Sequence, residues 1–263
     1  MNLGKSIVLL TAFCVSFAGY ASAQTKPRVV HVFVALADNA HQGIVPVPPA
    51  LGNGDDPAHN LYWGAAFGVR TFFKHSPEWK EVLFLKQPNK FVLERIVFQH
   101  QTDGILLVAD AYRGSEIKQC LIDFFRAAAG IPDKEPSQGG VLAGAVVQVP
   151  SIANLVVYVG HDGLMDFPLT VDFAGHSDAT RPAIILACAS KSFFRDLLRG
   201  SGASPLLWTT GLMAPEAYTL KAALDGWILQ EPQDQIRKRA AAAYAKYQKC
   251  SDTTAMRLFS TDW

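Results

Sequence analysis

The chain alternates short apolar runs with segments of helical spacing, and this alternation limits the possible folds more than any other feature of the sequence. The runs predicted as strands are residues 28–38, 81–85, 104–110, 154–160, 181–187 and 204–211. The predicted helices are residues 61–75, 89–100, 114–130, 190–200, 215–229 and 233–249. Strands that alternate with helices form a mainly parallel sheet covered on both faces. The sequence therefore predicts an α/β fold, a three-layer α/β/α sandwich.

The first 23 residues have the pattern of a secretory signal peptide. Lys5 precedes an apolar stretch at residues 6–19, and the small residues Ala21–Ala23 fit a cleavage site. This apolar stretch is too short and too interrupted to span a membrane comfortably. We expect an exported protein, periplasmic or secreted, whose residues 24–263 form a single α/β domain with a helical extension from about residue 232. An uncleaved signal that tethers the chain to a membrane is the alternative.

Charge and cysteine content restrict the partners and the covalent links. The formal net charge is +1 and no basic block stands out, which argues against nucleic acid and membrane-surface partners. The mature chain would keep Cys120, Cys188 and Cys250, an odd number in a compartment that favours disulfides. One pair and one free thiol is the simplest outcome, with Cys120 and Cys250 as the candidate pair, and three reduced thiols remain open. The oligomeric state is not predicted.

Reactive side chains follow several predicted strands, where ligands of open α/β sheets bind. They are Asp38, Asn39, Asp110, His161, Cys188, Thr209 and Thr210. Consecutive strands are usually neighbours, and parallel neighbours lie about 4.8 Å apart. His161 and Cys188 end consecutive strands, so they can supply a thiol nucleophile and its base. A helix is predicted directly after Cys188, and helix N–H groups favour a thiolate.

Two motifs carry a resemblance to a known family. "LVVYVGHDG" and "AIILACASKS" resemble the caspase–hemoglobinase superfamily of cysteine peptidases, in which one apolar strand ends in His-Gly and the next in Ala-Cys. Residues 187–192 are similar to the legumain form Ala-Cys-x-Ser-Gly-Ser. The resemblance spans roughly residues 29–229, although only the two motifs are specific. It implies a caspase-like fold and a cysteine endopeptidase that cleaves peptides or proteins without a cofactor, with Cys188 as nucleophile and His161 as general base and acid.

The same resemblance implies supporting roles for further residues. The N–H groups of Cys188 and of the turn after His161, at Asp162 and Gly163, would form the oxyanion hole. Asn39 would orient His161, a match that rests on position alone. The inserted Asp162 departs from the His-Gly motif, and Lys191 replaces a glycine of the second motif. These departures support an alternative, a non-catalytic periplasmic binding or assembly module that keeps the fold. A thiol-dependent hydrolase or transferase acting on a non-peptide substrate is a third interpretation.

The polar loop after the first strand offers His41, Asp55, Asp56 and His59, but their spacing matches no metal motif. We therefore predict no metal site. If this loop overhangs the His161–Cys188 pair, then Asp38, Asp55 or Asp56 would favour a basic substrate residue. The sequence contains neither a G-x-S-x-G elbow nor a dinucleotide or P-loop fingerprint.

Overall fold

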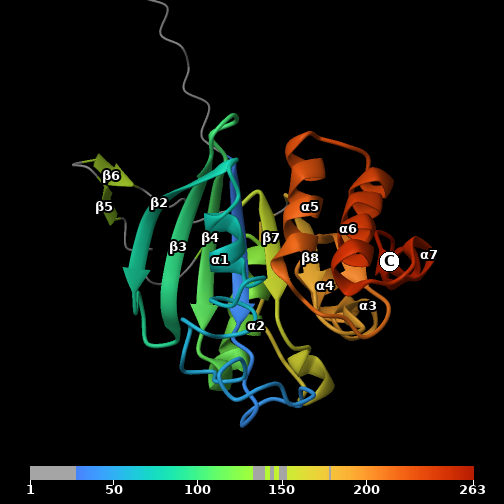
Figure 1. Cartoon of the computed structure of the whole chain (residues 1–263), viewed down its shortest axis with the longest axis horizontal. Helices are drawn as coiled ribbons and strands as arrows, with labels where there is room; N and C mark the ends of the chain where they lie inside the picture. Colours follow the sequence, from blue (N-terminus) through green and yellow to red (C-terminus); the bar gives the residue numbers. More distant parts are fainter. Residues whose placement is uncertain (1–27, 133–139, 143–144, 148–152, 178) are drawn as a thin grey trace, which may run out of the picture.

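A computed structural model describes residues 28–132, 140–142, 145–147, 153–177 and 179–263, with side chains of residues 133–152 left undescribed. The predicted signal peptide, residues 1–23, lies outside this part. One sheet of eight strands has the order β10-β9-β8-β7-β1-β4-β3-β2 (Figure 1). The parallel strands are β1 (Val29–Ala35), β4 (Leu106–Tyr112), β7 (Leu155–Val159), β8 (Pro182–Leu186) and β9 (Ser204–Thr209). The antiparallel strands are β2 (Trp79–Lys86), β3 (Val92–His100) and β10 (Phe259–Ser260).

Helices cover both faces of this sheet, which confirms the predicted three-layer α/β/α sandwich. One face packs against α1 (Val69–Lys74), α5 (Ala217–Ile228), α6 (Gln233–Gln248) and α7 (Asp252–Leu258). The other packs against α2 (Ile117–Ala128), α3 (Ser190–Phe193) and α4 (Arg195–Gly200). Alternate residues of β1 supply both cores, since Val32 belongs to the first and Phe33 to the second. Successive side chains of a strand point to opposite faces, so a strand buried on both sides is apolar throughout.

The segment 89–100 was predicted as a helix, and that prediction is wrong. It forms β3, which pairs with both β2 and β4. Every residue from Val92 to Phe98 is buried, so the polar alternation that marks a half-exposed strand is missing. The predicted helix at 61–75 begins only at Val69. Between residues 132 and 150 the described residues form two short strands, β5 (Gly140–Leu142) and β6 (Ala145–Val147), which pair with each other.

The C-terminal region belongs to the same core and is not an appendage. Ile236 and Ala240 of α6 and Ala255 of α7 are buried in the core of the α5 face. The chain then returns to the sheet, where β10 pairs with β9, and Trp208 Nε1 donates to the Asp262 carbonyl at 2.9 Å. Among the described helices, none has the length and apolar character needed to cross a membrane.

The predicted disulfide between Cys120 and Cys250 is wrong for this fold. Cys120 lies on α2 in the core of one face, whereas Cys250 follows α6 and packs against the core of the other. The sheet separates the two side chains, and Cys120, Cys188 and Cys250 are all free thiols. Burial raises the pKa of the Cys120 thiol well above its usual range.

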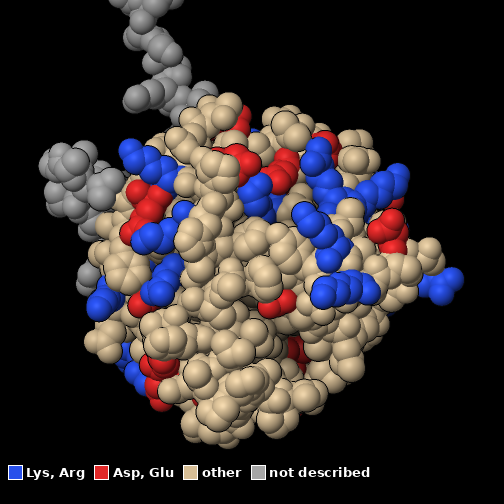
Figure 2. Space-filling view, in the orientation of Figure 1, with Lys and Arg blue, Asp and Glu red and all other residues tan. Residues whose placement is uncertain are grey.

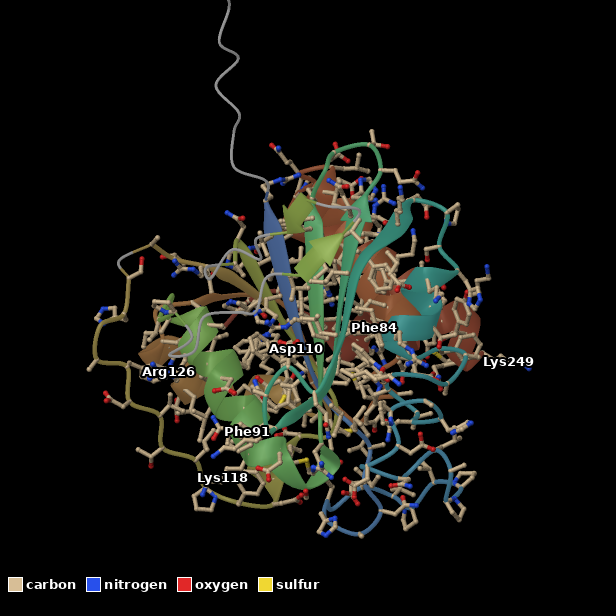
Figure 3. All side chains as sticks on the ribbon, turned by 90° about the vertical axis from the view of Figure 1, so that its left-hand side faces the viewer. Phe84, Phe91, Asp110, Lys118, Arg126 and Lys249 are labelled. Carbon is tan, nitrogen blue, oxygen red and sulfur yellow. The ribbon has the colours of Figure 1, made fainter. Side chains whose placement is uncertain are left out.

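Asp110 does not end its strand, as the sequence predicted, because β4 continues to Tyr112. Its side chain is fully buried in the middle of the molecule, between the sheet and α2 (Figure 3). Arg95 of β3 donates to both carboxylate oxygens at 2.6 and 2.7 Å, and His31 Nε2 of β1 lies 2.8 Å from Oδ2. Burial alone would raise the pKa of Asp110, but the Arg95 charge and these hydrogen bonds hold that pKa well below its usual range. The Asp110 carboxylate therefore links β1, β3 and β4, and it does not lie at the edge of the sheet where β1 and β4 end.

Candidate active site

His161 and Cys188 stand at matching positions on adjacent parallel strands. Val159 of β7 lies opposite Leu186 of β8, and the same step along each strand leads to His161 and to Cys188. The Gly160 N–H donates to the Leu186 carbonyl at 3.2 Å, which continues the ladder to the end of the strands. In Figure 1 these ends lie at the lower edge of the sheet. The structure thus places the two residues just after the ends of adjacent parallel strands.

Cys188 occupies a sharp, well-anchored turn between β8 and α3. Ala189 has a positive φ of 47°, which turns the chain, and its N–H donates to the Gly211 carbonyl at 2.8 Å. The half-buried Cys188 Sγ accepts the Met213 N–H at 3.4 Å. Ser190 Oγ donates to the Ile185 carbonyl at 3.1 Å and fixes the start of α3. The thiol also donates to the Met213 carbonyl at 3.6 Å, so both of its hydrogen bonds are to the backbone of Met213.

His161 is held from both its backbone and its ring. The Tyr158 hydroxyl donates to the His161 carbonyl at 2.7 Å. The ring Nε2 lies 2.7 Å from Oδ2 of Asp166, which follows the short 3₁₀ helix η2 (Gly163–Met165). Nδ1 makes no hydrogen bond within the described part of the chain. Sequence reasoning missed Asp166, because only the fold of η2 brings its carboxylate back to the ring.

The two residues after His161 are turned inward. Asp162 is fully buried, and its Oδ1 accepts the Leu164 N–H at 3.0 Å, which starts η2. Its Oδ2 is buried without a partner among the described residues, and burial raises the pKa of this carboxyl to about 7. The Gly163 N–H donates to the His161 carbonyl at 3.1 Å, and Gly163 packs against Ile117. Asp162 and Gly163 therefore support the turn with their side chain and backbone.

The N–H donors that remain for an oxyanion hole therefore differ from those that the motif implied. The Gly163 N–H is already used inside the turn. By contrast, the N–H groups of Asp162 and Cys188 have no acceptor within the residues that the structure describes. Of the backbone donors that the motif implied, these two are therefore the ones not already used within the described structure.

Asn39 does not contact His161. Its side-chain amide donates to the Val47 carbonyl at 2.8 Å and accepts the Val47 N–H at 3.1 Å, so it closes the loop after β1. Asp38 is buried beneath the same loop, where it accepts the Ala40 N–H at 2.9 Å and lies 2.8 Å from His41 Nδ1. Both side chains build the loop.

The other acidic residues proposed for substrate binding are also paired within the described structure. Asp55 forms an ion pair with Arg113. Asp56 Oδ2 lies 2.7 Å from His59 Nδ1, and this hydrogen bond lowers the pKa of Asp56. Within the described residues, neither Asp55 nor Asp56 contacts Cys188.

The rim of the site is apolar. The loops that follow β1, β7 and β9 expose Val45 (85 %), Met165 (45 %) and Leu212 (75 %), and α3 exposes Phe193 (41 %). Figure 2 shows that Lys and Arg gather on the upper part of this face, while the lower edge over the loop after β1 is mostly uncharged.

Behind Cys188 lies a group of buried hydroxyls and a carboxyl that the sequence did not single out. Burial raises the pKa of Tyr62, and the nearby Cys188 and Glu216 raise it further. The Tyr244 hydroxyl accepts the Ala214 N–H at 3.3 Å, and the Tyr218 hydroxyl donates to Glu216 at 2.8 Å. Burial also raises the pKa of Glu216. Tyr62, Tyr218, Tyr244 and Glu216 thus form a polar cluster close to Cys188.

No group of three His, Cys, Asp or Glu side chains within the described residues is arranged to hold a metal ion. A cleft of about 390 Å³ lies away from the strand ends, between α1 and strands β2 and β3, where Phe84 and Ile96 meet charged side chains. Figure 3 shows Phe84 on the α1 side of the sheet, opposite Lys118 and Arg126 of α2.

No family model, curated protein or solved structure matches this chain. The resemblance to caspase–hemoglobinase peptidases stays a prediction from two motifs.

Proposed function

We propose that this chain is an exported cysteine endopeptidase that uses Cys188 and His161. The single observation that carries the proposal is the matched register of β7 and β8, which presents both side chains at one edge of the sheet. A half-buried thiol with a backbone N–H donor, beside an imidazole with one ring nitrogen available, has the parts of a nucleophile and its base. Export is inferred from residues 1–23 alone.

The proposed reaction needs no cofactor. His161 Nδ1 takes the proton from Cys188 Sγ, and the thiolate attacks the scissile carbonyl carbon. The negative oxygen of the tetrahedral intermediate receives hydrogen bonds from the N–H groups of Cys188 and Asp162. The imidazolium gives its proton to the leaving amine, and a thioester remains. A water molecule, deprotonated by His161, then attacks the thioester; the acid product leaves and the proton returns to the thiolate.

Alkylation of the three cysteines tests the Cys188–His161 pair directly. The rate of iodoacetamide labelling against pH is measured for each cysteine by peptide mass spectrometry, in the unaltered protein and in His161→Ala. We expect Cys188 to be labelled faster than Cys250 and to lose about tenfold in rate without His161. Cys250 is half-buried on another segment and serves as the internal control, and the fully buried Cys120 reports unfolding. Equal Cys188 rates in the two proteins would contradict the pairing.

Hydrolysis is then tested with a mixed-sequence library of uncharged and charged peptides. We expect cleavage by the unaltered protein and none by Cys188→Ser, which retains the size of the side chain. Cleavage that persists in Cys188→Ser would assign the activity elsewhere.

A second candidate is the non-catalytic binding module. The inward-facing Gly163 N–H favours it, because the motif's usual oxyanion donor is then unavailable. This function predicts peptides that bind at the apolar rim, remain intact, and bind Cys188→Ser equally well.

A further inference from the structure

We propose that Asp166 is a positioning residue for His161, and that the loop after β1 holds Asp166 in place through Gly43. This inference rests on the proposed function, because it assigns a third group to the Cys188–His161 pair. It differs from the prediction from sequence, which gave the orienting role to Asn39.

One carboxylate oxygen makes both contacts. Asp166 Oδ2 lies 2.7 Å from His161 Nε2 and accepts the Gly43 N–H at 3.0 Å. A Cβ atom at position 43 would overlap the Asp166 carboxylate, so only glycine permits this close approach. Figure 1 shows the loop after β1, in blue, beside the yellow segment that follows β7 at the lower edge of the sheet. Gly43 and His161, which are far apart in the sequence, therefore both contact Oδ2 of Asp166.

The contact determines which ring nitrogen is the base. An ionised carboxylate only accepts hydrogen bonds, so Nε2 must carry the proton when it faces Asp166. In the neutral ring Nδ1 is then the unprotonated nitrogen, and it is this nitrogen that has no hydrogen bond within the described residues. When His161 becomes an imidazolium, the negative charge of Asp166 stabilises it. Asp166 thus acts on the thiol through the ring and does not contact the reacting atoms itself.

The loop that presents Gly43 is itself fixed. Gln42 Nε2 donates to the Leu36 carbonyl at 2.8 Å and to the Gly114 carbonyl at 2.9 Å, at the ends of β1 and β4. Asn39 closes the loop on Val47 with two hydrogen bonds. The Asp166 side chain is 31 % exposed, so water competes for it, and an anchored N–H donor reduces its freedom to turn away. The loop therefore contributes to the site through Asp166.

The test compares Asp166→Ala, Asp166→Asn and Gly43→Ala in the Cys188 alkylation profile and in peptide hydrolysis. We expect Asp166→Ala to move the labelling profile to higher pH and to lower kcat about tenfold, with KM little changed. Asp166→Asn should behave in the same way, because an amide can donate to Nε2 and so favour the opposite tautomer. The exposed Asp196 provides the matched control, and Asp196→Ala should leave the profile unchanged.

Gly43→Ala tests the contribution of the loop without removing a side chain from the site. We expect it to shift the profile in the same direction by displacing the carboxylate, and Gly43→Ala with Asp166→Ala to equal Asp166→Ala alone. The ring ¹⁵N shifts of His161 report the tautomer independently of activity. If His161→Ala slows Cys188 labelling as expected but the Asp166 variants keep the profile and the tautomer, this inference fails and the pair stands. If His161→Ala changes nothing, the proposed function fails as well.

Discussion

At the scale of single residues, Asp162 is a source of instability at high pH. Its carboxyl has a pKa raised from 3.8 to about 7, because it is buried with one oxygen unpartnered. The folded state therefore holds a proton that the unfolded state releases from about pH 4 upward. Stability should fall as the pH rises through this window and level off above pH 7.

Asp162→Asn should remove this dependence. An amide resembles the protonated carboxyl, so we expect the variant to gain up to about 4 kcal/mol in the free energy of unfolding at pH 8. At pH 5 the gain should be less than half as large, because the carboxyl is still protonated in the folded state there and only the unfolded chain has lost its proton. Urea unfolding at both pH values measures the difference. A gain of equal size at pH 5 and pH 8 would contradict the raised pKa.

At the scale of elements, the Arg95–Asp110 pair joins β3 to β4, and His31 extends it to β1. Arg95→Leu leaves a buried carboxylate without this partner and should cost about 3–5 kcal/mol. Arg95→Leu combined with Asp110→Leu should cost less, because no charge then stays buried. A double-mutant cycle followed by urea unfolding gives the coupling. Additive costs would mean that the two side chains stabilise the sheet independently.

The strands that lead to the site could be predicted from the sequence, whereas β3 could not. The runs that became β1, β7, β8 and β9 are long, apolar and bounded by polar residues, and the side chains at their ends follow directly. The strand β3 was misread because burial on both faces removes the alternation that identifies a strand. Asp166 was missed for another reason: its contact with His161 depends on a short 3₁₀ turn, which leaves no periodic signal.

At the scale of the whole molecule, β10 protects an edge of the sheet. Phe259 is 1 % exposed, and the strand covers the hydrogen-bonding groups of β9. Phe259→Ala should cost about 3–5 kcal/mol, and the loosened edge should promote self-association. Thermal unfolding and light scattering measure the two effects. Trp263→Ala, at a partly exposed ring beside Trp208, is the control, and an equal loss there would argue against a special role for β10.

The order of the strands also has a kinetic consequence. β1 comes first among the described strands yet lies inside the sheet, between β4 and β7, which follow much later in the chain. Contacts between distant parts of a chain form slowly, because a large loop must close before they stabilise anything. Pairing of β1 with β4 and β7 should therefore limit how fast the whole sheet forms, whereas β7 and β8, which precede His161 and Cys188, are close in the sequence. The proposed Cys188–His161 pair would then be complete only in the folded chain, and newly made copies would not cleave one another before they fold.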